Sequence, residues 1–171
     1  MLSRSIVTLL CAVTLAPGLV LAQEQPTEPT PEQTIARLQY QWEALFVASM
    51  VAAQGQGQSP AEHGASIGQL FAPGWSDDLT PQGLARGMRN NFRLIGGEAE
   101  LTRDTEDVAV VRWRRLDQEP FMERHGSMGA TVDQYEECLK AVVEGIADAH
   151  NLVWAQETSG DWMVARVTRK G

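Results

Sequence analysis

The spacing of the apolar residues changes near Gly96-Gly97, and this change limits the fold of the whole chain. Before it, apolar residues recur every three or four positions, which is the period of an amphipathic helix. After it, two pairs of short segments alternate apolar and polar residues, as half-buried strands do, around one further helical segment. Helices that precede antiparallel hairpins predict an α+β fold.

Four helices are predicted, and each begins at an N-terminal signal. A hydroxyl residue is followed by proline at Thr30-Pro31, Ser59-Pro60 and Thr80-Pro81, whereas Thr131 forms a capping box with Gln134. Such signals satisfy backbone N–H groups that the first turn of a helix leaves unpaired. The expected helices cover about 31–53, 60–72, 81–95 and 131–149.

The first predicted helix has one apolar face, which comprises Ile35, Leu38, Trp42, Leu45, Phe46 and Ser49. In the second predicted helix, Gly64 and Gly68 lie one turn apart and present almost no side chain. Their spacing allows tight packing against another helix, which we favour, or the close approach of a ligand.

Strands are predicted over 98–102, 108–113, 152–157 and 162–168, which form two hairpins. The chain order is therefore about three N-terminal helices followed by ββαββ, with a four-stranded antiparallel sheet. We expect the helix at 131–149 to cross one face of this sheet, and the N-terminal helices to pack on the same layer or at its end. Residues 117–130 follow neither period and are predicted to form a long loop.

Residues 1–22 have the layout of a secretory signal peptide. Arg4 precedes an apolar run that Pro17-Gly18 breaks, and Ala22 is a small residue at the expected cleavage site. Residues 23–30 are polar and predict a flexible leader, which leaves 31–171 as one α+β domain. We therefore expect export to the periplasm or the medium, with no membrane attachment after cleavage. A retained N-terminal anchor is the alternative.

Net charge limits the expected partners, and cysteine content limits the possible disulfides. The chain has 14 Lys and Arg against 22 Asp and Glu, a formal net charge of −8. Nucleic acid is not an expected partner, because phosphate binding needs a basic surface. After cleavage only Cys138 remains, so no internal disulfide forms. Its mid-helix position behind two glutamates favours packing over catalysis.

The sequence has no strong catalytic motif and implies no cofactor. It lacks a nucleophile elbow, a phosphate-binding loop, a dinucleotide fingerprint and a zinc-protease helix. Each histidine, however, has an acid nearby in the sequence, and a carboxylate that orients an imidazole suits a general base. The catalytic candidates are His125, Glu123, His150, Asp148 and His63.

A metal site is a further hypothesis. Met122, His125 and Met128 have the spacing M-x2-H-x2-M within 117–130. Thioether and imidazole ligands suit Cu(I). Methionine is nevertheless often a core-filling residue, so the same pattern also fits simple packing.

Two main classes of function remain. The favoured one is a non-catalytic exported module that binds a small molecule or a protein, because it needs none of the missing motifs. The alternative is a small hydrolase-like enzyme that uses a histidine–carboxylate pair, or a weak copper-binding protein.

Export is directly testable by intact-mass measurement on exported material. We expect a chain that begins at Gln23, because cleavage should follow the small residue Ala22. A full-length mass in the soluble exported fraction would contradict the signal-peptide prediction.

Overall fold

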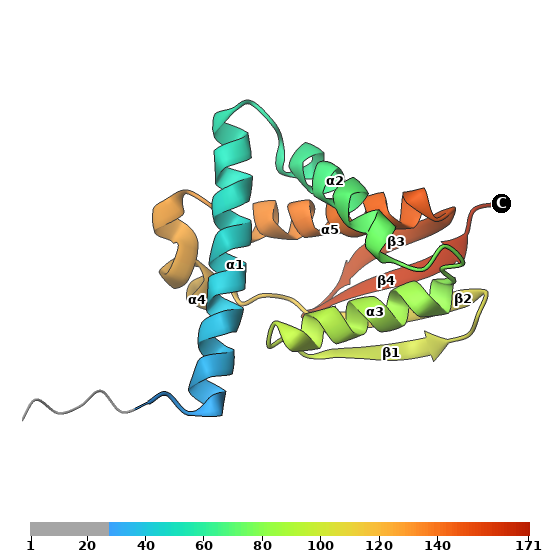
Figure 1. The fold of residues 1–171 in the computed structure, drawn as a ribbon, viewed down its shortest axis with the longest axis horizontal. Helices are drawn as coiled ribbons and strands as arrows, with labels where there is room; N and C mark the ends of the chain where they lie inside the picture. Colours follow the sequence, from blue (N-terminus) through green and yellow to red (C-terminus); the bar gives the residue numbers. More distant parts are fainter. Residues whose placement is uncertain (1–27) are drawn as a thin grey trace, which may run out of the picture.

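The computed structural model describes residues 28–171 (Figure 1). The predicted signal peptide and most of the predicted leader lie outside these residues. The helices are α1 (Pro31–Gly55), α2 (Pro60–Phe71), η1 (Ala72–Gly74), α3 (Pro81–Leu94), α4 (Gln118–His125), η2 (Gly126–Met128) and α5 (Val132–Ala149). The strands are β1 (Ala99–Asp104), β2 (Val108–Arg114), β3 (Leu152–Ser159) and β4 (Trp162–Arg169). The predicted α+β class is confirmed.

The predicted helix starts are present. Thr30, Ser59 and Thr131 each accept a hydrogen bond from the backbone N–H three residues on, and each forms a complete capping box. Thr80 caps α3 in the same way through the N–H of Gly83. Burial of one helix face adds the tertiary stabilisation that short helices need.

The four strands form one antiparallel sheet in the order β1-β2-β4-β3. Alternate residues of β2 and β4 point to the covered face, where Val111 pairs with Ala165 and Trp113 with Met163. Helices α3 and α5 pack on this face, and Phe92 of α3 stacks on Trp113 with ring centroids 4.4 Å apart. The expected position of 131–149 on the sheet is therefore confirmed.

Helix α2 packs on the far side of α5 through its two glycines. A Cβ at Gly64 would overlap the carbonyl oxygen of Cys138, and one at Gly68 would overlap that of Val142. Gly145 of α5 lies at the same contact, where an added Cβ would be 3.2 Å from the Cα of Gly68. The glycines thus serve helix packing, as the favoured alternative predicted.

Helix α1 crosses the end of these layers, beside α4 (Figure 1). Its buried residues Val47, Met50 and Ala53 lie in its C-terminal half, and the first two join a second core cluster with Phe121 and Tyr135. The apolar face expected for this helix is instead largely uncovered. Ile35, Leu38, Trp42 and Leu45 have exposed fractions of 55%, 59%, 42% and 72%.

The prediction of a long loop over 117–130 is wrong, because this segment contains α4 and η2. Pro120 falls in the first turn of α4, where its missing N–H costs no helical hydrogen bond. Only Phe121 and His125 of α4 are buried, one turn apart. Two positions are too few to reveal a helical period in the sequence.

Among residues 28–171, no helix is both long enough and apolar enough to cross a membrane.

The glycine contact between α2 and α5 gives a testable stability difference. We expect Gly64→Ala to lower the free energy of unfolding by about 2 kcal/mol or more, because the new methyl group forces two helix backbones apart. Gly55→Ala is the matched control, since a Cβ there meets nothing within 4 Å. Equal midpoints of chemical denaturation for the two variants would contradict the close packing.

Candidate functional site

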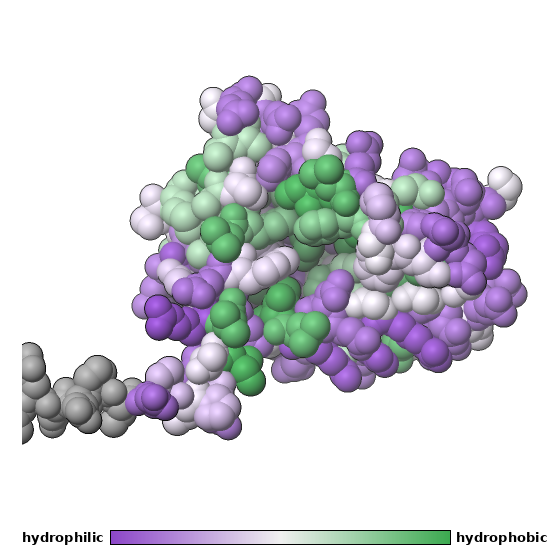
Figure 2. All heavy atoms as spheres, in the orientation of Figure 1, coloured by the Kyte–Doolittle hydropathy of each residue, from purple (hydrophilic) through white to green (hydrophobic). Residues whose placement is uncertain are grey.

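An apolar groove lies in the angle between α1 and the helices α2, α3 and α5. It encloses about 600 Å³. Figure 2 shows green apolar residues gathered around a hollow between α1, α2 and α3. The groove is lined by Ile35, Leu38, Gln39, Trp42, Phe46, Phe71, Gly74, Trp75, Met88, Asn91, Phe92, Leu94, Ile95, Leu139, Val142 and Ile146.

The groove exists because the N-terminal half of α1 stands away from the body of the protein. Its hydrogen bond to the body runs from the amide nitrogen of Gln39 to the carbonyl oxygen of Leu94, at 2.8 Å. The side chains of Ile35, Leu38 and Trp42 therefore reach the groove from one side without filling it. A contiguous apolar surface of this kind usually marks a binding site.

The groove has no charged lining residue. Its polar side chains are the amides of Gln39 and Asn91 and the indole N–H groups. Such a lining offers neither a general base nor a nucleophile. It suits binding of an apolar surface, with one or two hydrogen bonds to fix orientation.

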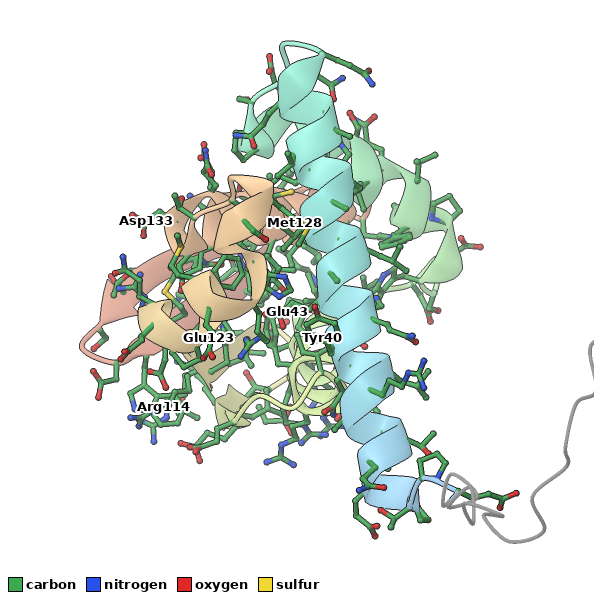
Figure 3. The ribbon with its side chains drawn as sticks, turned by 90° about the vertical axis from the view of Figure 1, so that its left-hand side faces the viewer. Tyr40, Glu43, Arg114, Glu123, Met128 and Asp133 are labelled. Carbon is green, nitrogen blue, oxygen red and sulfur yellow. The ribbon has the colours of Figure 1, made fainter. Side chains whose placement is uncertain are left out.

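A second feature is a histidine–carboxylate contact between α1 and α4. Nε2 of His125 lies 3.2 Å from a carboxylate oxygen of Glu43, and the His125 side chain is fully buried. Neither ring nitrogen makes a well-aligned hydrogen bond. Arg124 also contacts Glu43, with its Nε 3.3 Å from the same oxygen. Figure 3 shows Glu43 and Tyr40 between the two helices.

Aromatic rings surround this contact. Tyr40 stacks on the His125 ring at a centroid distance of 5.8 Å, and Phe121 packs edge-on at 5.1 Å. Tyr135 packs on Phe121 in turn. Burial, with a smaller contribution from the Glu43 charge, raises the pKa of Tyr135 well above its usual value. Tyr135 is therefore a neutral phenol at physiological pH and not a base.

Glu43 also faces a smaller hollow of about 210 Å³. Glu136, Arg124 and Tyr135 contribute to its polar wall. Phe92, Ile95 and Leu139 line both this hollow and the apolar groove, so the two spaces share a wall. Glu43 is thus a carboxylate at the edge of an open space, with a buried imidazole behind it.

The other predicted histidines lie elsewhere and have different partners. His63 contacts the hydroxyl of Ser49 at 3.1 Å. Nε2 of His150 lies 3.0 Å from the carbonyl oxygen of Ala72. Asp148 pairs with Lys170 at the surface, and Glu123 is exposed on α4. The residues of 28–171 contain no group of three or more His, Cys, Asp or Glu that is arranged to hold a metal ion.

The two methionines of the copper hypothesis flank His125 in the sequence, three residues before it and three residues after it. Met122 is partly exposed on α4, and Met128 of η2 packs against the second core cluster. His125 itself is enclosed by aromatic rings.

Cys138 is a packing residue, as predicted. It is fully buried, and burial together with the charge of Glu137 raises the pKa of its thiol to about 11. A thiol with so high a pKa is not a nucleophile near neutral pH.

Sequence reasoning missed Glu43, although a signal for it exists. Glu43 lies four residues before Val47 and seven before Met50, which are both buried. It therefore occupies the core-facing stripe of α1, where an acid is unusual unless it has a partner. An acid at this spacing pointed to a buried cation or imidazole in another element.

The chain matches no protein family, no curated protein and no solved structure in three comparisons.

His125→Ala tests whether this histidine is structural. We expect a loss of about 2–4 kcal/mol in the free energy of unfolding, since the variant leaves a cavity among Tyr40 and Phe121. The partly exposed Met122→Ala should change it by less than about 1 kcal/mol. Equal loss of Cu(I) binding in both variants, at unchanged stability, would favour the copper hypothesis instead.

Proposed function

We propose that this chain is an exported, non-catalytic protein-interaction module, and that its groove receives the apolar face of a partner helix. The observation that carries the proposal is the exposed stripe of Ile35, Leu38, Trp42 and Leu45 along α1. An amphipathic helix that lies in an apolar groove is a recurrent mode of protein recognition.

The extent of the stripe favours a protein over a small molecule. A molecule confined to the groove would cover Ile35, Leu38 and Trp42, which line it. Leu45 does not line the groove, yet it is 72% exposed and continues the same stripe by one turn. A helix that follows α1 covers all four residues, whereas a compact ligand leaves Leu45 in water.

A histidine-dependent hydrolase is the second candidate function. The contact between Glu43 and His125 supports it, since Glu43 borders an open hollow and His125 has no other polar partner. The full burial of His125 weighs against this candidate, because the imidazole could act on a substrate only through Glu43. Loss of a measured hydrolytic activity in a folded His125→Ala variant would favour this candidate.

The groove can be tested with the apolar fluorophore 1-anilinonaphthalene-8-sulfonate at low micromolar protein. We expect enhanced fluorescence with the unmodified chain and a several-fold weaker signal with Leu38→Gln, which makes the groove wall polar. Val153→Gln is the control, since Val153 is an exposed apolar residue on β3. No enhancement with the unmodified chain, or equal enhancement in Leu38→Gln, would overturn the proposed groove.

A further inference from the structure

We infer that the partner helix is α1 of a second copy of this chain, packed antiparallel across a two-fold axis. The inference rests on the proposed function, because it names the occupant of the same groove. It makes the chain a homodimer through α1.

The stripe has the spacing of a helix–helix seam. Ile35, Leu38, Trp42 and Leu45 follow one another at intervals of three, four and three residues, which is the spacing of the core positions in a two-stranded coiled coil. These are four of the large apolar side chains that the described structure leaves exposed. The seam is therefore present in α1 and has no facing helix within residues 28–171.

The seam is also self-complementary in the antiparallel direction. If the axis passes midway between Leu38 and Trp42, Leu38 of one copy faces Trp42 of the other. At the same alignment, Ile35 faces Leu45 of the second copy. Every member of the stripe then has an apolar partner, as a two-fold interface requires of a single surface patch. The dipoles of two antiparallel helices also oppose each other favourably.

Charge at the seam does not oppose a contact between identical chains. The full chain carries a net charge of −8, so two copies repel each other at long range, and like charges placed at the contact would add to that repulsion. The positions that flank the stripe are Thr34, Gln39, Gln41, Phe46 and Ala48, and none is charged. In a seam of this type the flanking charges select the partner, and here they neither oppose a second copy nor favour a charged one.

The opposite walls of the groove extend the same surface. Phe71 at the end of α2 and Leu94 at the end of α3 line the groove and are 57% and 72% exposed. The open side of the groove faces outward beside α1 (Figure 2). A second α1 that enters this side covers both residues together with the stripe. Homodimer interfaces are more apolar than other protein contacts, which agrees with a groove that has no charged lining.

Sedimentation equilibrium over a range of chain concentrations tests the dimer. We expect reversible dimers, with the dissociation constant raised about 30-fold or more by Leu38→Glu or by Leu45→Glu, because each places a charge in the seam. Val153→Glu is the matched control and should leave the constant unchanged. Circular dichroism on each variant confirms the fold. Dimers that resist both stripe variants, or that Val153→Glu weakens equally, would overturn the inference.

Cysteine cross-linking tests the direction of pairing. The buried Cys138 is out of reach, so the test uses a Cys11→Ser background. Ile35→Cys chains and Leu45→Cys chains are oxidised each alone and, in a third sample, after they have been mixed. Antiparallel pairing predicts disulfide dimers from the mixture and few from either chain alone. Dimers that form equally well from each separate chain would overturn the antiparallel arrangement.

Failure of this inference differs from failure of the proposed function. A chain that stays monomeric at all concentrations, yet enhances the fluorophore in a Leu38-dependent way, has a working groove with another occupant. A chain that does neither has no such groove. For a dimer, fluorophore bound per chain should fall as chain concentration rises, since the second copy occupies the site.

Discussion

The close contact between α2 and α5 determines how the rest of the molecule is arranged. Gly64 and Gly68 let the two helix backbones approach until no side chain fits between them. Helix α5 can therefore pack on the sheet with one face and on α2 with another, and its first turns still reach α1 through Tyr135 and Cys138. Both core clusters contain residues of α5. The placement of α5 on the sheet therefore also fixes where α1 and α4 can pack.

The elements that follow local rules were predictable from the sequence. Capping residues at Thr30, Ser59, Thr80 and Thr131 mark helix starts because their hydrogen bonds stay within one turn. Alternation predicts the strands because one face of the sheet is covered and the other is not. Residues of α4 escaped prediction because the helix is short and buries only Phe121 and His125.

The location of the candidate site could not be predicted from neighbouring residues in the sequence. The apolar face of α1 was identified correctly as apolar, but its position relative to the body is set by Glu43, Val47 and Met50 on the adjacent face. Periodicity locates an apolar stripe and does not say which partner covers it. Similarly, sequence proximity suggested Glu123 as the acid beside His125, whereas the contacting carboxylate belongs to Glu43 of α1, far away in the sequence.

Helix α1 is anchored more firmly at its C-terminal half than at its N-terminal half. Its C-terminal half is fixed by buried side chains, whereas its N-terminal half holds to the body through Gln39 and the groove contacts. Segments with few buried contacts open locally at a much lower free energy than the whole protein. If a partner binds along this half, part of the interaction energy is spent on suppressing its local opening, and the contact becomes easier to reverse.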